Sequence, residues 1–537
     1  MAEGYFNKQY LVVDDFADMR AAIRSILRSL GISHVDQARD GKDAIARMDQ
    51  TRYDVVMCDY NLGAGKDGQQ VLEEARLRQL IQLDGIFIMI TAENTREMVM
   101  GAAEYAPDSY LAKPFTKELL KQRLDKVFER KAYLAGVNKA LIAKDYAGAI
   151  ARLSELIADS PRNLADLLKL KTDICLMACR YDEALAICEQ ILGTREIAWA
   201  RLGLGKALYG KKRYAQAQDI FTQLIASEPD LIDAHDWLAK TQTAQQQFEE
   251  AENTLQAATR LSPRGLKRYQ LLGNLALNNG HPAAAEAAFG HAVSLARHSV
   301  LNHPSLFAGM ARAKASNHKP VEALKMIGEI GKVFPDHPEA AFYKATATAV
   351  VKQHQGDPEG ALEALQIAEQ IMAERGNSPH SKLGLEMAKT YVQLGEQGKL
   401  ASLLKASIAN NHDDEEFLTE IVQLCREAGQ DYDAEQAIRE IQQEIVKTNN
   451  AGVRLIKQGE FDAAIELLHE AAEEMPANKT INLNAAMASI VKMEKMGTTG
   501  EDIQCVRQYI GRVHVLDPHD WRLGDVIARL RKLAPKV

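Results

Sequence analysis

The chain has 537 residues, a formal net charge of −8 at pH 7 and a sequence pI near 6.0, so it lacks the overall positive charge that recruits nucleic acid. Hydrophobic residues make up 46% of the sequence and charged residues 26%, which is typical of a folded globular protein. A chain of this length predicts two to four domains of about 100–200 residues each, or one long repeat array.

The N-terminal sequence MAEGYFNKQYLVVDDF contains no basic segment followed by an apolar stretch, which a secretory leader requires. The sequence also has no apolar run of about 18 residues, the length that a membrane helix needs. Its six cysteines form no CxxC pair, and so few cysteines in a long chain fit a reducing compartment. We therefore expect a cytoplasmic protein with no membrane insertion.

Five short apolar runs alternate with amphipathic segments in the first part of the chain. They span residues 10–13, 35–38, 54–58, 85–90 and 109–112. Strands that alternate with helices in this way predict a parallel sheet covered by helices on both faces. The expected fold class is therefore α/β, with a five-stranded, doubly wound parallel sheet.

Polar side chains stand where these predicted strands end. Asp14 and Asp15 follow the first strand, Asp59 the third, Thr91 the fourth and Lys113 the fifth. In a sheet of this kind, ligands bind beyond the carboxyl ends of the strands. Clustered carboxylates repel one another unless a cation neutralises them, and their oxygen atoms suit Mg²⁺. A lysine and a threonine beside them offer donors to phosphoryl oxygens, so the pattern predicts an aspartyl-phosphate site.

The segments VVDD, DYNLGAGKDG, ITAEN and SYLAKPF, in this order, resemble the receiver domain of two-component response regulators, the chemotaxis type especially. The resemblance covers roughly residues 8–130. It implies that Asp59 accepts the phosphoryl group. The implied ligands of Mg²⁺ are Asp59, Asp15, Asp14 through a water molecule, and the backbone carbonyl of Asn61.

The same resemblance assigns roles around the acceptor. Thr91 and Lys113 would bind the phosphoryl group, and Tyr110 would be the aromatic switch. Asn61 and Glu93 would tune how easily water attacks the phosphoryl group, and their residue types imply a short-lived phosphate. A sensor histidine kinase or a histidine phosphotransfer protein would supply the phosphoryl group.

The loop after the acceptor departs from the family pattern at two places. Gly63 stands four residues after Asp59, where the family usually has proline, and the GAGKDG loop is one residue longer before Gly68. Neither change removes a chemical group from the site. Both affect the shape and stiffness of the loop, and hence the choice of partner.

A helical apolar pattern continues from the predicted receiver into the rest of the chain. Residues 116–144 keep this pattern, and no proline or Gly/Ser-rich tether interrupts them. We therefore expect the last receiver helix to pass into the first repeat helix directly, as one rod, or through a tight bend. Either connection would hold the receiver at a defined angle, and phosphorylation would shift this interface or a homodimer contact beside it.

Similar segments recur through the remainder of the chain, among them DYAGAIARL, RYDEALAIC, RYAQAQDIF, QFEEAENTL and HPAAAEAAF. Their first anchors are separated by 35, 33, 34 and 34 residues and are Tyr146, Tyr181, Tyr214, Phe248 and Pro282. This period, with alanine at the helix crossing and proline after the second helix, resembles the tetratricopeptide repeat. It predicts an all-α superhelical solenoid with a concave surface.

We thus expect three parts: a receiver at 1–130, an array of about ten to eleven hairpins at 131–518, and a capping helix at 519–537. The repeat phase is uncertain between about 296 and 450: the register first loosens, with the anchors Pro320 and Pro358 following at steps of 38 residues, and from about 376 to 450 the pattern is hard to phase.

The repeat region contains no Walker loop, HExxH, GxSxG or basic recognition helix. The leading hypothesis is therefore an adaptor that is not an enzyme, in which phosphorylation of Asp59 controls what the repeat groove binds. That groove partner is an unidentified protein. One alternative is a phosphoryl sink, or an inhibitor of a sensor kinase that acts on another regulator. Another alternative is a degenerate output enzyme within the repeats, against which the lack of clustered acid, base or metal-binding residues argues.

Overall fold

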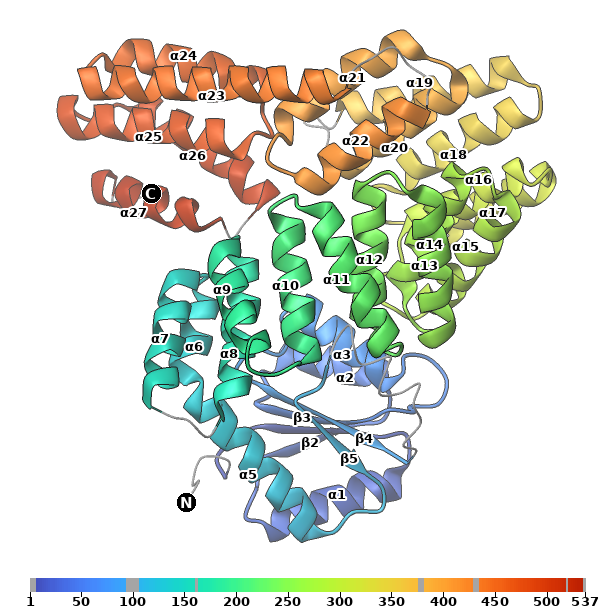
Figure 1. The fold of residues 1–537 in the computed structure, drawn as a ribbon, viewed down its shortest axis with the longest axis vertical. Coiled ribbons are helices and arrows are strands. Elements are labelled where there is room, and N and C mark those ends of the chain that lie inside the picture. Colours follow the sequence, from blue (N-terminus) through green and yellow to red (C-terminus); the bar gives the residue numbers. More distant parts are fainter. Residues whose placement is uncertain are drawn as a thin grey trace. The chain divides into compact units, whose positions relative to one another are not determined.

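The computed structural model describes residues 6–92, 106–159, 163–374, 381–427, 434–517 and 520–534. Contacts divide the chain into two compact units, Met1–Leu306 and Phe307–Val537. The first unit holds a β-sheet and a set of helical hairpins, and the second is helical (Figure 1).

Five parallel strands form the sheet, in the order β2-β1-β3-β4-β5. Their bounds are β1 Tyr10–Val13, β2 Val35–Ala38, β3 Val55–Asp59, β4 Ile86–Thr91 and β5 Ser109–Ala112. The predicted α/β class is confirmed, and two strands lie one residue later than expected, so that Asp59 and Thr91 are themselves the last strand residues. Because β1 lies between β2 and β3, strand order reverses beside its carboxyl end, where ligands of such sheets bind.

Helices cover both faces of the sheet. Two of them, α1 (Ala17–Ser29) and α5 (Lys117–Tyr133), lie on one face, and α2 (Gly41–Gln50) and α3 (Gly68–Leu77) on the other (Figure 1). Each helix buries an apolar stripe at helical spacing, as α5 does with Leu120, Leu124 and Val127. The three central strands, β1, β3 and β4, are wholly buried, which is why they appear as continuous apolar runs. The edge strands β2 and β5 are only partly buried.

The receiver is joined to the first hairpin by a bend, not by a continuous rod. Helix α5 ends at Tyr133 and α6 (Ala135–Ile142) begins two residues later. Leu134 caps both helices: its amide donates to the Arg130 carbonyl at 3.1 Å, and its carbonyl accepts from the Asn138 amide at 2.8 Å. Of the two connections expected from the sequence, the tight bend is the one that forms.

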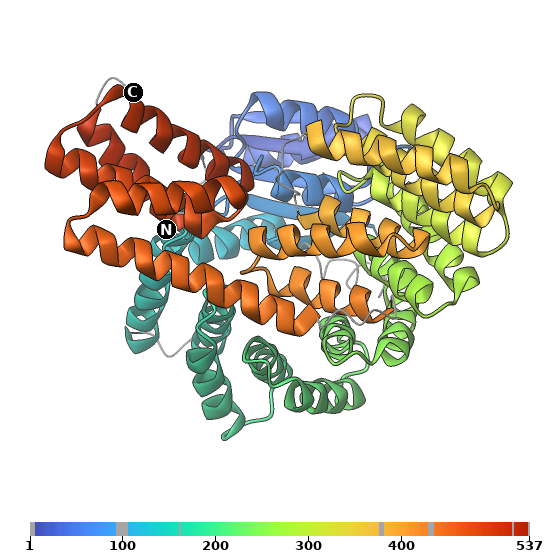
Figure 2. The same ribbon diagram turned by 90° about the horizontal axis from the view of Figure 1, so that it is seen from above.

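Hairpins of antiparallel helices follow in the first unit, and Figure 2 shows the teal to green helices as a curved row. Their bounds are α7 Tyr146–Asp159, α8 Leu164–Met177, α9 Tyr181–Leu192, α10 Ala198–Gly210, α11 Tyr214–Ser227, α12 Ile232–Ala244, α13 Phe248–Leu261, α14 Leu266–Asn278 and α15 Pro282–Ala296. Every predicted anchor is the first residue of a helix. Glycines permit the closest crossings, because a Cβ on Gly273 would lie 2.7 Å from the Phe289 ring.

The second unit continues the helical pattern. Its helices, with α16 spanning the boundary, are α16 Pro304–Ser316, α17 Pro320–Val333, α18 Ala340–His354, α19 Pro358–Glu374, α20 Ser381–Leu394, α21 Gln397–Asn410, α22 Glu415–Glu427, α23 Ala434–Gln458, α24 Phe461–Glu474, α25 Lys479–Met496, α26 Gly500–Leu516 and α27 Trp521–Leu533. Helix α23 has 25 residues and contacts both α22 and α24. One continuous helix therefore packs against both the helix before it and the helix after it. No turn within 434–458 marks a repeat boundary, which explains why the sequence is hard to phase in this segment.

One backbone turn recurs before the second helix of the hairpins. The residue two positions before each anchor has a positive φ, from 54° to 84°, at Lys144, Cys179, Lys212, Gln246, Gly280, His318, Gly356, Gly395 and Gly459. Only glycine adopts this left-handed conformation without steric cost. The turn at Gly395 lies two residues before the start of α21. It therefore shows where a hairpin lies in the segment in which the sequence pattern is hard to follow.

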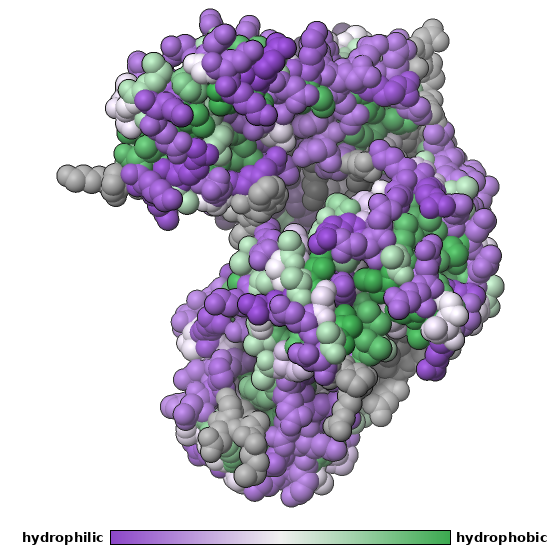
Figure 3. All heavy atoms as spheres, turned by 60° about the vertical axis from the view of Figure 1, so that its left-hand side comes forward, coloured by the Kyte–Doolittle hydropathy of each residue, from purple (hydrophilic) through white to green (hydrophobic). Residues whose placement is uncertain are grey.

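One face of the molecule is mostly polar. Hydrophilic side chains cover most of the face seen in Figure 3, with smaller apolar patches among them. Within the described ranges, no helix is both long enough and apolar enough to cross a membrane.

We expect Gly459→Ala to lower the free energy of unfolding by about 1–2 kcal/mol, because the Cβ of alanine is sterically strained in the left-handed conformation. No atom lies within 4 Å of the position that its Cβ would take, and φ is +84°, so the loss would come from the backbone alone. Gly328→Ala in α17 is the matched control. Its Cβ also meets nothing within 4 Å, and alanine should raise helix stability there by up to about 1 kcal/mol. Urea unfolding followed by circular dichroism measures the free energy of unfolding of both variants. If the two substitutions changed it equally, the strain assigned to the left-handed turn at Gly459 would be wrong.

Candidate functional site

Side chains from three strands meet at the carboxyl edge of the sheet. Asp14 follows β1, Asp59 ends β3 and Lys113 follows β5. The Lys113 ammonium donates to Asp14 Oδ2 at 2.7 Å and to Asp59 Oδ2 at 2.8 Å. Asp14 is fully buried and Asp59 is 7% exposed. These two ion pairs therefore lie in a region of low dielectric, where charge interactions are strong.

A third carboxylate completes an acidic cluster. Asp15 is exposed, and one carboxylate oxygen from each of Asp14, Asp15 and Asp59 lies within 4.8 Å of the others. Lys113 balances only one of these three negative charges. The remaining charge, the oxygen ligands and the solvent-facing position of Asp15 fit a hydrated divalent cation of the Mg²⁺ type.

Burial sets the acidity of the two central groups. It raises the pKa of Asp59, Lys113 lowers it, and the charge of Asp14 raises it further, with a net increase. Burial alone would lower the pKa of Lys113, but its hydrogen bonds to Asp14 and Asp59 outweigh this effect and raise it. Lys113 is thus held as a cation, while the ionised form of Asp59 is destabilised unless a further positive charge is bound.

The loop after β3 lies against the acidic cluster. Gly63 has a φ of +72°, and a Cβ there would lie 3.3 Å from Asp15 Oδ2. Proline is fixed near a φ of about −65° and cannot adopt this conformation. The departure from the family's proline is therefore a difference in backbone shape, as expected from the sequence. A Cβ on Gly68 would lie only 2.2 Å from the Asp59 carbonyl oxygen, so α3 starts in direct contact with the end of β3.

The other predicted site residues lie around this centre. Thr91 is 5% exposed at the end of β4, and its carbonyl accepts from the Lys113 amide at 2.7 Å. Asn61 is exposed, and its Oδ1 accepts from the Gly63 amide at 3.3 Å. Glu93 lies outside the described residues.

Tyr110 is half-buried in β5 and packs against the core beneath α2 and α3. Its hydroxyl is buried and has no hydrogen-bond partner among the described residues. Burial, with a smaller contribution from Tyr60, raises the pKa of Tyr110 to about 12. The ring thus occupies an inward position, and its hydroxyl stays protonated at neutral pH.

The sequence pattern does not indicate the roles of two residues at the edge of the site, Arg20 and Gly68. Arg20 donates to the Asp14 backbone carbonyl at 2.6 Å and so fixes the turn between β1 and α1. Gly68 permits the close approach of α3 described above. An arginine six residues after an aspartate and a glycine at a helix start are too common to identify such roles from one sequence.

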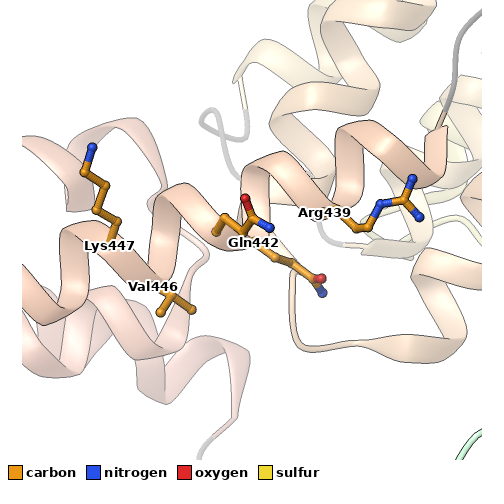
Figure 4. Close-up of a pocket in the computed structure, with 5 residues that line it drawn as sticks. Arg439, Gln442, Val446 and Lys447 are labelled. Carbon is orange, nitrogen blue, oxygen red and sulfur yellow. The ribbon is translucent and has the colours of Figure 1, made fainter.

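Two further clusters outside the sheet give no comparable site. Glu252 is buried, and it accepts hydrogen bonds from Gln256 at 3.1 Å and Asn279 at 2.7 Å and lies 2.9 Å from His281 Nδ1. These contacts use its oxygens to join adjacent hairpins. A shallow pocket in the second unit is lined by Arg439, Gln442, Gln443, Val446 and Lys447, all from α23 (Figure 4). A single helix face does not bring polar groups together from several directions, as a catalytic centre requires.

Comparisons with known proteins identify a receiver domain and tetratricopeptide repeats in this chain. The response regulator receiver domain family matches residues 10–125, and tetratricopeptide repeat families match residues 208–275 and 266–299. Chemotaxis protein CheY-3 of Vibrio cholerae is 37% identical over 124 residues, which are 23% of this chain and 94% of that protein. Chemotaxis protein CheY of Pseudomonas aeruginosa is 34% identical over 120 residues, 22% of this chain and 95% of that protein. A structure of the chemotaxis response regulator CheY4 of Vibrio cholerae is 27% identical, covers 22% of this chain and 98% of its own, and aligns with a TM-score of 0.21.

We expect Mg²⁺ to stabilise the first unit, because it neutralises the charge that Lys113 leaves unbalanced. A concentration of ten times Kd should add about 1.4 kcal/mol. The effect should weaken as pH falls, and at a higher pH than for an ordinary aspartate, since protons compete at the raised pKa of Asp59. Thermal unfolding with and without Mg²⁺ measures this. Asp15→Asn removes an exposed ligand without disturbing the core, so an undiminished Mg²⁺ effect in this variant would count against the site.

Without Mg²⁺, Asp59→Asn should be more stable than the native chain in neutral buffer. The pKa of Asp59 is raised in the folded state, so its ionisation opposes folding, and the native chain gains stability as pH falls through this raised pKa. The asparagine variant lacks this dependence. We expect a gain of about 2–4 °C in Tm at neutral pH that disappears in acid. A gain that is independent of pH would show that charge is not its cause.

Proposed function

Because this chain belongs to the response regulators, with a receiver domain followed by tetratricopeptide repeats, we propose that phosphorylation of Asp59 controls which proteins it binds. The observation that carries the proposal is the Lys113 ammonium held between Asp14 and Asp59, with a third carboxylate beside them. Lysine in this position can pair with the new negative charge when Asp59 becomes an acyl phosphate.

The acceptor acts as a nucleophile in this proposal. A carboxylate oxygen of Asp59 attacks phosphorus, an O–P bond forms, and the P–N bond to a histidine of the donor breaks. Mg²⁺, held by Asp14, Asp15, Asp59 and the backbone carbonyl of Asn61, would supply charge neutralisation at the phosphoryl oxygens. Lys113 and the Thr91 hydroxyl then bind these oxygens, and Tyr110 responds to the movement of Thr91.

The donor is a sensor histidine kinase or a histidine phosphotransfer protein, and the output is a protein contact of the repeat array. We propose the domain limits 1–130, 131–518 and 519–537, with α27 as the cap of the array. We also propose that Asn61 and Glu93 tune the lifetime of the phosphate, as the resemblance to chemotaxis receivers implies.

We predict that acetyl phosphate and Mg²⁺ label the full chain and that Asp59→Ala abolishes the label. Lys113 donates to both Asp14 and Asp59, but Asp14 is fully buried, whereas Asp59 is 7% exposed and can reach a phosphoryl donor. Labelling is read by intact mass. The control is Asp84→Ala, which removes an exposed surface carboxylate and should leave the label unchanged. Label retained in Asp59→Ala would refute the acceptor assignment.

A further inference from the structure

The start of α3 in the receiver contacts one end of the α14–α15 hairpin, about 200 residues later in the first unit. The Lys66 ammonium donates to the His298 carbonyl at 2.5 Å, and the Gln70 side chain donates through Nε2 to the Leu295 carbonyl at 3.3 Å. These acceptors lie at the C-terminal end of α15, where helix carbonyls lack partners within the helix. A cation is favoured there by the helix dipole.

An arginine from the repeats completes the contact from the other helix of the hairpin. Arg264 lies just before α14 and donates to Asp67 Oδ2 at 2.9 Å. Its guanidinium lies 5.2 Å from the centre of the Tyr60 ring, within the range of a cation–π interaction. Tyr60 directly follows Asp59, so Arg264 reaches the residue next to the acceptor.

A third contact is partly closed to solvent. The Ser299 hydroxyl donates to Glu73 Oε2 at 2.7 Å, and Ser299 is 8% exposed. Burial raises the pKa of Glu73, which the hydrogen bond from Ser299 and the charge of Lys267 partly offset. We call this set the α3 clasp: Lys66, Asp67, Gln70 and Glu73 on the receiver, with Arg264, Leu295, His298 and Ser299 on the repeats.

The clasp is built on the cap of α3. Asp67 Oδ1 accepts from the Gln70 amide at 2.9 Å, and Gln70 Oε1 accepts from the Asp67 amide at 3.2 Å. Each of these side chains therefore caps the helix with one atom and contacts the repeats with the other. The receiver side of the clasp is fixed to the end of a helix, so it moves with that end.

The same helix end is packed against the acceptor strand. The Gly68 amide donates to the Tyr60 carbonyl at 2.8 Å, and no space for a Cβ separates Gly68 from the Asp59 carbonyl. Residues 60–67 thus form a short loop with the acidic cluster at Gly63 on one side and the clasp on the other. A phosphoryl group on Asp59 and a cation beside Asp15 would lie against this loop, since Gly63 approaches Asp15 and Gly68 approaches Asp59. A shift of the loop would carry Lys66 and Asp67 with it and so change the clasp bonds.

We propose that the α3 clasp docks the receiver on the α14–α15 hairpin in the unphosphorylated chain and that phosphorylation of Asp59 loosens it. The inference rests on the proposed function for the phosphorylation step. By linkage, a variant with a broken clasp should bind a phosphoryl mimic more tightly, because it no longer gives up the clasp on binding.

The test compares beryllofluoride binding, with Mg²⁺ present, in the native full-length chain and in Arg264→Glu. Because the Arg264–Asp67 pair is partly exposed, we expect about 2- to 5-fold tighter binding in the variant. Arg260→Glu is the matched control, since it makes the same charge change at an exposed position of α13 outside the clasp. It should bind like the native chain. Equal or weaker binding in Arg264→Glu would overturn the clasp proposal.

Hydrogen–deuterium exchange separates this result from a failure of the proposed function. Beryllofluoride should raise exchange in residues 66–75 and 295–300 of the native chain, and Arg264→Glu should raise it there without any ligand. Beryllofluoride that binds and leaves these segments unchanged would overturn the inference alone. If beryllofluoride does not bind at all, the phosphorylation function and its control of the clasp both fail. The ligand-free comparison then still decides whether the contact exists.

Discussion

One ammonium group between two buried carboxylates organises the site. Lys113 neutralises only part of the charge that Asp14 and Asp59 bring to the edge of the sheet, and burial makes the unbalanced remainder costly. The three residues stand at the ends of three different strands, so only the pairing of these strands in the parallel sheet brings them together. Everything that the receiver can do chemically depends on how this charge imbalance is relieved, by a proton, a cation or a phosphoryl group together with a cation.

Much of this could be predicted from the sequence, because the signals are local. Strands buried on both faces appear as apolar runs, and the polar residues that end them are visible as Asp14, Asp59, Thr91 and Lys113. The anchors of the first hairpins are equally local, since each starts a helix after the same left-handed turn. These features need no knowledge of distant contacts.

The rest depends on contacts or conformations without a local signature. Helix α23 runs through 434–458 without a turn, so the sequence gives no local mark of a repeat boundary within it. Gly63 signals a changed loop but not its left-handed geometry. Arg264 and Asp67 are separated by 197 residues, and nothing in the segment around either residue indicates the other. The repeat period identifies a hairpin, but not the surface on which its end rests.

The covalent connection through the bend at Leu134 determines how strongly α3 and the α14–α15 hairpin associate. As separate chains, two surfaces joined by a few partly exposed polar bonds would associate weakly, since each such bond contributes little in water. The covalent passage through α5 and α6 keeps the two surfaces in the same molecule, so they meet at a high effective concentration. Bonds that are individually weak can then hold a defined arrangement and still separate quickly. A switch driven by phosphorylation of Asp59, as we propose, would require such a contact, which is formed in most molecules and yet opens quickly.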